Sequence, residues 1–119
     1  MPAVQQEINR RQQNNPVRLT LEYLSQHGVG HQSPVSLGVI VAHLQAQGVN
    51  ITATGFQQTV LKTSRGADYF IGSGNRGYFL INTIDDARVM RDFYETRIQA
   101  EQHNLANLRR QAVHVGWNL

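Results

Sequence analysis

The fold is decided by residues 52–81, which read TATGFQQTVLKTSRGADYFIGSGNRGYFLI. In the first half, Phe56 and Val60 are one helical turn apart and Leu61 broadens the same face, so we expect a short amphipathic helix that packs through these side chains. The second half has two aromatic and aliphatic runs around a glycine-rich centre, the composition of a β-hairpin. The stretch therefore predicts a helix that runs directly into a hairpin.

The predicted hairpin has its tip at Gly74-Asn75-Arg76-Gly77. We expect both glycines to allow the positive φ that a tight turn needs, and the turn to expose the asparagine and the arginine. Because successive strand residues point to opposite faces, one of Tyr78 and Phe79 should lie in the core and the other should be exposed.

The rest of the chain divides by its capping and breaking residues. Pro16 suits the first turn of one helix, Ser36 suits the N-cap of a second that stops at Gly48, and Thr83 with Asp86 resembles a capping box that opens a last, long helix. The third helix should run from about residue 54 to 64, with a corner at 65–67. We predict four parts: an amide-rich segment at 1–15 that is a flexible arm or a frayed helix ending before Pro16, a domain of three helices and a hairpin at 16–82, a long helix at 83–115 and a tail at 116–119.

The chain has 119 residues, a formal net charge of +3 and no cysteine. Six basic and three acidic side chains lie in residues 1–82, whereas residues 83–119 carry five of each sign, so the excess positive charge accompanies the helix and hairpin. Disulfides and thiolate metal sites are excluded. We expect neither a membrane span nor a secretory signal, because the apolar runs are short and the N-terminal residues are polar.

Apolar side chains in the predicted last helix recur at alternating spacings of three and four residues from Ile84 onward. This is a heptad seam, which Arg91 and Glu101 interrupt. A stripe of this length cannot all be covered by so small a domain, so part of it should pack on another helix. We predict a homodimer whose contacts are made by Tyr94, Ile98, Leu105, Leu108 and Ala112.

The order helix, helix, helix, hairpin, helix over residues 16–105 resembles the winged helix-turn-helix fold of DNA-binding regulators. More narrowly, YFIGSGNRGYFL at 69–80, followed by a helix that opens at Thr83, is similar to small phage and mobile-element winged-helix proteins. The resemblance implies an α+β fold in which the third helix and the hairpin, or wing, contact double-stranded DNA.

Helical periodicity turns one face of the third helix away from the expected core. A helix-turn-helix uses the start of this element for base edges and its ends for phosphates, so the residues of the outward face can be given roles. Thr54, Gln57 and Gln58 are predicted to meet bases or nearby phosphates, Lys62 and Arg65 to meet phosphates, and Arg76 with Asn75 to enter a minor groove or lie on a phosphate. The alternative is an ordinary solvated polar face.

Other chemistries are less well supported by the sequence. His27 and His31 have a zinc-binding spacing, but the glycines between them break the helix that this spacing requires. The paired acids Asp85-Asp86 fit helix capping better than metal binding. Ser73 lies between two glycines of the hairpin and fits turn chemistry. We therefore predict no enzyme, no metal site and no cofactor.

The sequence thus predicts a small transcriptional regulator that binds double-stranded DNA with sequence preference, as a homodimer, and represses by occupying a promoter. Its expected location is the cytoplasm, on the nucleoid when DNA is bound. Two alternatives stay open. One is a winged-helix protein-interaction module without DNA binding, and the other is the DNA-recognition part of a restriction or mobile-element system.

Overall fold

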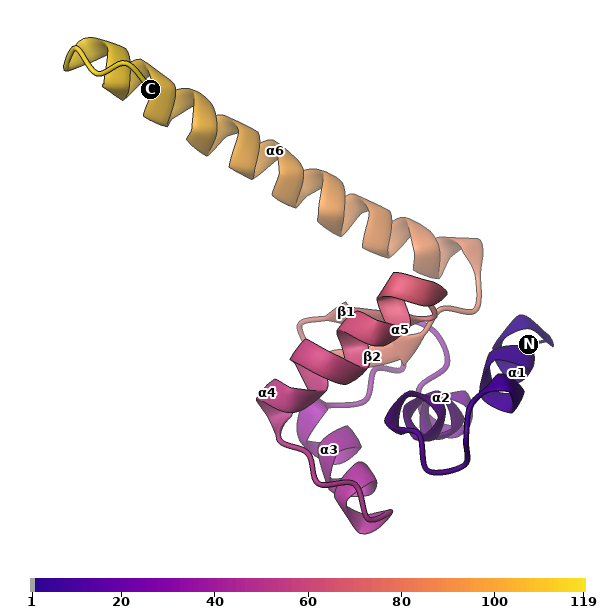
Figure 1. Cartoon of the computed structure of the whole chain (residues 1–119). Helices are drawn as coiled ribbons and strands as arrows, with labels where there is room; N and C mark the ends of the chain where they lie inside the picture. Colours follow the sequence, from indigo (N-terminus) through magenta and orange to yellow (C-terminus); the bar gives the residue numbers. More distant parts are fainter. Residues whose placement is uncertain (1) are drawn as a thin grey trace. The chain divides into compact units, whose positions relative to one another are not determined.

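The computed structural model describes residues 2–119, in two compact units, Met1–Ala87 and Arg88–Leu119, which we call the head and the C-terminal unit. The described chain is α+β, mostly helical with a two-stranded antiparallel hairpin and a long last helix, as predicted (Figure 1). The elements are α1 (Pro2–Arg10), α2 (Pro16–His27), α3 (Leu37–Ala46), α4 (Ala53–Gly55), the π-helical η1 (Phe56–Leu61), α5 (Lys62–Ala67), β1 (Ile71–Gly74), β2 (Gly77–Leu80) and α6 (Ile84–His114).

Helix α2 is the central element of the head and packs against α1, α3, η1 and β2. The helix begins at Pro16, and the side chain of Asn15 accepts hydrogen bonds from the backbone N–H groups of the next turn. Ser36 caps α3 in the same way, as predicted. The hydrophobic core of the head contains fully buried side chains, among them Leu21, Leu24, Ile40, Leu44, Phe56 and Ile71.

Helix α1 occupies residues 2–10 of the segment that the sequence predicted as a flexible arm or a frayed helix, and Met1 lies outside the described residues. Val4 and Ile8 are one turn apart and retain only 3% and 4% of their exposure. Their burial in the core of the head gives residues 2–10 a reason to fold. With only two apolar residues on this face of an amide-rich segment, the sequence did not predict that the segment packs on the core.

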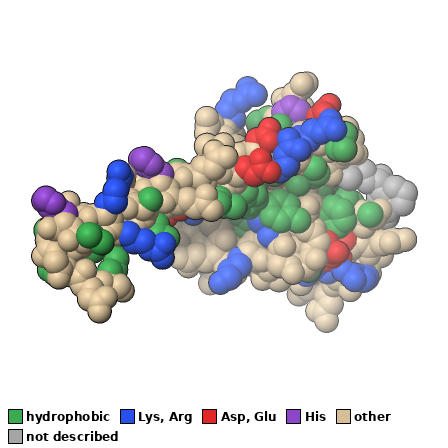
Figure 2. Space-filling view, turned by 90° about the horizontal axis from the view of Figure 1, so that it is seen from above, with side chains coloured by type: hydrophobic (Ala, Val, Ile, Leu, Met, Phe, Trp, Pro, Cys, Tyr) green, Lys and Arg blue, Asp and Glu red, His purple; other side chains and the backbone are tan. Residues whose placement is uncertain are grey.

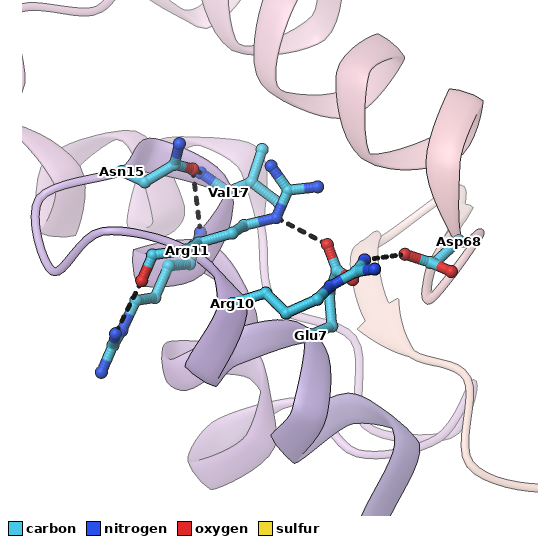
Figure 3. Close-up of polar contacts among 7 residues, drawn as sticks. Glu7, Arg10, Arg11, Asn15, Val17 and Asp68 are labelled. Atoms are coloured by element: carbon cyan, nitrogen blue, oxygen red, sulfur yellow. Dashed lines mark hydrogen bonds and ion pairs between the residues drawn. The ribbon is translucent and has the colours of Figure 1, made fainter.

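A cluster of ion pairs connects the end of α1 to a part of the head that is distant in the sequence (Figure 3). Arg11 donates from Nε to Glu7 over 2.6 Å, and Arg10 pairs with the same carboxylate. Arg10 also donates to Asp68 over 2.9 Å, and Asp68 is the C-cap residue that follows α5. The cluster therefore links α1 to the C-terminal end of the third helical segment.

The third helical segment runs without a break through α4, η1 and α5. Thr52 caps its start by accepting a hydrogen bond from the backbone N–H of Gly55 over 3.0 Å. Phe56, Val60 and Leu61 face the core, as predicted. The segment ends at Ala67 with Asp68 as its C-cap, so the corner expected at 65–67 is still helical.

The hairpin pairs β1 with β2 from Ile71 opposite Leu80 to Gly74 opposite Gly77. Gly77 has the predicted positive φ, +134°. The φ of Gly74 is not positive, so the expectation for that residue was wrong. A side chain at position 77 would also meet the Val35 carbonyl, because an added Cβ would lie 2.1 Å from its oxygen. Gly77 is thus required by both backbone conformation and space.

Strand β2 has neighbours on both of its edges. Besides β1, the loop between α2 and α3 pairs with it: Tyr78 and Val35 exchange two backbone hydrogen bonds of 2.7 and 2.8 Å. Both Tyr78 and Phe79 are buried, so the prediction that one would be exposed was wrong. The ring of Phe79 occupies the space that a side chain at Gly72 would need, and its centre lies 6.3 Å from that of the His31 ring, so this face of the hairpin has neighbours that alternation alone does not predict.

Helix α6 opens with the predicted capping box. The backbone N–H of Asp86 donates to Thr83 Oγ1 over 3.2 Å, and the N–H of Thr83 donates to Asp86 Oδ2 over 3.1 Å. Asp86 also accepts from the backbone N–H of Asn82 and His31, both over 2.9 Å, and its Oδ1 lies 2.5 Å from His31 Nδ1. Burial raises the pKa of Asp86, but the hydrogen bonds from His31, Asn82 and Thr83 outweigh it and hold this pKa well below its ordinary range.

The C-terminal unit consists of the rest of α6 and a short tail that turns back on it. The chain leaves the helix after His114, and Gly116 adopts a φ of +81°. Trp117 then donates its backbone N–H to the Ala112 carbonyl over 2.8 Å, and Ala112 is 2% exposed. Neither α6 nor another helix among residues 2–119 has the length and apolar character needed to cross a membrane.

We expect the Gly77→Ala variant to lose about 3 kcal/mol of unfolding free energy, because it combines an unfavourable φ with a clash against Val35. The control is Gly74→Ala at the partner position, where an added Cβ meets nothing within 4 Å and φ is not positive; it should change stability by about 0.5 kcal/mol or less. Urea unfolding of both variants is the measurement. Equal effects would contradict the requirement for glycine at position 77.

We expect the Asp86→Asn variant to be less stable than wild type at neutral pH, and this difference in unfolding free energy to become smaller in acid. The lowered pKa of Asp86 contributes stability that is present above the ordinary carboxyl pKa and is lost as pH falls toward the folded-state pKa. The gap in unfolding free energy between wild type and Asp86→Asn should therefore narrow by about 1 kcal/mol between pH 7 and pH 3. Urea titrations across this range test it, and a constant gap would refute the role of the ionised carboxylate.

Candidate nucleic-acid interface

The outward face of the third helical segment carries most of the predicted contact residues. Thr54, Gln58 and Lys62 are exposed, opposite the buried Phe56 and Val60. The segment opens at a capped N-terminus, where backbone N–H groups and the helix dipole favour negative charge. This face can therefore present hydroxyl, amide and ammonium groups to a polyanion.

The middle of this segment, η1, is π-helical, which changes the spacing of its outer face. Three consecutive residues, Gln57, Gln58 and Thr59, are all exposed between the buried Phe56 and Val60. The Thr59 hydroxyl donates back to the Gly55 carbonyl, a contact that occupies its donor within the helix. The two adjacent glutamines are thus the side-chain amides that this turn presents.

Gln57 is less free than its exposure suggests. Its amide nitrogen donates to the Tyr78 hydroxyl on β2 over 3.2 Å. The Tyr78 ring in turn packs edge-on against Phe56, with 5.3 Å between the ring centres. Of the two glutamines, Gln58 is therefore the more available for an outside partner, and Gln57 helps to hold the helix against the hairpin.

Arg65 has a structural role that the sequence did not predict. Its Nε donates to the Ile71 carbonyl over 3.1 Å, its Nη2 donates to Ser73 Oγ over 3.0 Å, and its guanidinium lies 4.8 Å from the centre of the Tyr69 ring. The side chain is half-buried rather than extended into solvent. Arg65 thus joins the end of the third helical segment to β1, and its predicted contact with phosphate could use only the remaining N–H groups.

Asn75 and Arg76 lie exposed at the tip of the hairpin, between the paired Gly74 and Gly77. The two-residue loop is therefore where the sequence placed it. Because β2 is paired on both edges and Arg65 holds β1, the hairpin is fixed at its base while its tip carries a cation and an amide.

The acidic side chains are distributed so that this surface keeps its positive charge. Asp68 is the sole acid between residues 23 and 84, and it is paired with Arg10. Among residues 2–119, the ion pairs of the head occupy Arg10, Arg11 and Arg18 but not the three cations of the third helical segment and hairpin, Lys62, Arg65 and Arg76. The charge of these three is therefore not neutralised from within the described head.

Three of the five histidines lie against aromatic or acidic neighbours. The ring of Tyr23 lies 4.6 Å from that of His27 and 4.4 Å from that of His43, centre to centre, and His31 is paired with Asp86. Within the part of the chain that the structure describes, no three His, Asp or Glu side chains are grouped as metal ligands would be.

Comparison of the chain with protein-family models, with curated proteins and with solved structures gave no match.

We expect Arg65→Lys to reduce the unfolding free energy by about 1 to 2 kcal/mol, because an ammonium cannot reproduce two hydrogen bonds from one planar group and a stacked contact. Lys62→Ala is the matched control one turn away on the exposed face, and it should change stability by about 0.5 kcal/mol or less. Urea unfolding distinguishes them. If Arg65→Lys were as mild as the control, the contact between helix and hairpin would not contribute to stability.

Proposed function

We propose that the head is a winged helix-turn-helix that binds double-stranded DNA with sequence preference. The observation that carries the proposal is the set of cations on the third helical segment and the hairpin, Lys62, Arg65 and Arg76, in a stretch whose one acid is paired elsewhere. Two adjacent positive elements on one folded unit are the footprint expected of a protein that meets phosphates.

The arrangement of the elements supports the winged-helix assignment. The order of α2, α3, the third helical segment and the hairpin is the order of elements in a winged helix-turn-helix. Contacts from Gln57 and Arg65 hold the hairpin against the third helical segment. A helix and a wing that move as one body can engage a groove and the adjoining backbone together. This is a more specific arrangement than a polar helix face alone.

In the proposed complex, the N-terminal half of the third helical segment enters the major groove. Thr54 and Gln58 face base edges, with Gln57 beside them, because hydroxyl and amide groups match the hydrogen-bonding pattern displayed there. Lys62 lies against a phosphate, and the wing tip places Arg76 and Asn75 on the minor groove or its flanking phosphates.

We further propose that the protein is a small transcriptional regulator and acts as a homodimer through α6. Two heads related by a two-fold axis recognise an inverted repeat, and a dimer bound at a promoter represses by occupancy. The exposed apolar side chains of α6, among them Ile98, Leu105 and Leu108, support pairing with a second helix.

A protein-interaction module is the second candidate, and the modest charge favours it. The head carries six basic and five acidic side chains, a net charge of +1, which is low for a dedicated DNA-binding domain. Placement rather than total charge is what supports DNA here. The acids Glu7, Glu22 and Asp68 pair with arginines at positions 10, 11 and 18, and the other two acids of the head lie in the first turn of α6.

We expect the affinity for duplex DNA to fall steeply with salt, and Lys62→Ala and Arg76→Ala each to reduce the slope of log K against log salt by about 0.9, the value for one lost phosphate contact. The matched control is Arg110→Ala, on the exposed surface of the C-terminal unit, which should leave the slope unchanged. Fluorescence anisotropy over a range of salt concentrations measures all three variants.

Selection of binding sites from random duplex DNA completes the test. An enriched inverted repeat would support the regulator. Weak binding that is independent of salt, with no enriched site, would contradict DNA as the partner and favour the interaction module.

A further inference from the structure

The exposed face of α6 contains two opposite charges within an apolar seam. Counting in alternate steps of three and four from Arg91 gives Tyr94, Ile98, Glu101, Leu105 and Leu108. Tyr94, Ile98, Glu101 and Leu105 line one groove, which confirms that the acid shares the face of the apolar residues. Ile98, Leu105 and Leu108 are 54%, 44% and 53% exposed.

Basic and apolar side chains both appear on the surface of this helical unit (Figure 2). Polar residues at single seam positions are known to specify the register and orientation of paired helices, because a mismatched pair leaves a charge against an apolar or like-charged group. Arg91 and Glu101 therefore restrict which pairing α6 can form with a second copy.

A parallel pair in register is the unfavourable arrangement. Each seam residue would face its own copy, so Arg91 would oppose the partner's Arg91 and Glu101 the partner's Glu101. Both contacts bring like charges together within the seam, where they are less screened than on an open surface. Nothing in the seam compensates for these two repulsions.

An antiparallel pair can satisfy both charges. With the two-fold axis beside Thr96, Arg91 faces the partner's Glu101 and Glu101 faces the partner's Arg91, while Tyr94 and Ile98 face each other across the centre. Sliding the helices by one heptad places Arg91 opposite Tyr94 or Leu108 instead, so this register is the one that matches the charges.

From this complementarity we propose that α6 pairs with α6 of a second copy in antiparallel orientation, through reciprocal ion pairs between Arg91 and Glu101. The inference rests on the homodimer of the proposed function and specifies its geometry. The two heads then leave from opposite ends of the paired helices.

Contacts within one chain are compatible with this pairing. Arg91 donates to its neighbour Asp92 over 2.9 and 3.0 Å, but both side chains are largely exposed, and exposed pairs contribute little. A guanidinium has five N–H groups, so donors remain for a second carboxylate. Ala112, which the sequence placed in the dimer contact, is covered by its own tail, and the paired stretch ends before it.

Charge reversal tests orientation and register in the full chain. Arg91→Glu and Glu101→Arg should each weaken the dimer about 10-fold or more, because each places like charges in both reciprocal contacts. The double variant R91E/E101R restores opposite charges and should return the dissociation constant to within about 3-fold of wild type. Arg110→Glu, which lies outside the seam, is the control for the same change of net charge. Sedimentation equilibrium without DNA gives the constants.

Cross-linking provides a readout that is independent of charge, because the chain has no cysteine of its own. In the antiparallel register, Leu105→Cys places the two thiols about 27 Å apart along the axis, too far for a disulfide. An equimolar mixture of Arg91→Cys and Glu101→Cys chains should cross-link, since these positions face each other. Efficient self-cross-linking of Leu105→Cys would indicate a parallel pair and overturn the proposal.

The pairing and DNA binding can fail separately. A wild-type chain that is monomeric at tens of micromolar, or charge variants that are not rescued by the double reversal, would overturn the antiparallel pair whatever the DNA result. Loss of DNA binding in Lys62→Ala or Arg76→Ala should leave the dimer constant unchanged, because both residues lie in the head and outside the seam.

Discussion

The head depends on the pairing of β2 along both of its edges. A lone two-stranded hairpin is marginal in water, and here the loop between α2 and α3 supplies a further neighbour through the hydrogen bonds between Val35 and Tyr78. That close approach is possible because residue 77 has no side chain. Gly77 therefore allows the pairing between β2 and this loop.

Side-chain contacts connect the hairpin to the candidate interface. Tyr78 contacts Phe56 by its ring and Gln57 by its hydroxyl, and Arg65 reaches across to β1. Asp68, at the end of the same helical segment, is tied to α1 through Arg10. The segment proposed to enter the groove is thus held at its middle by the hairpin, and an exposed ion pair joins its end to α1.

The sequence predicted the features that depend on local chemistry. The caps at Ser36 and Thr83, the core face around Phe56 and the turn at residues 74–77 follow from spacing and residue type. It failed where a distant partner decides. Phe79 packs over the backbone of Gly72 and beside the ring of His31, and Arg65 donates to a carbonyl six residues later that only the folded hairpin brings near. The roles proposed for Lys62 and Arg76 remain predictions.

The clamp made by Arg65 has a consequence for the thermodynamics of recognition. Flexible elements that become ordered on binding lose conformational entropy at that step, which lowers the affinity available from the same contacts. Here the base of the hairpin is already immobilised in the free protein by the guanidinium and by β2 pairing. Association with a partner would then order little beyond the side chains of the tip, and its entropy change should be dominated by released water and counterions rather than by the protein chain.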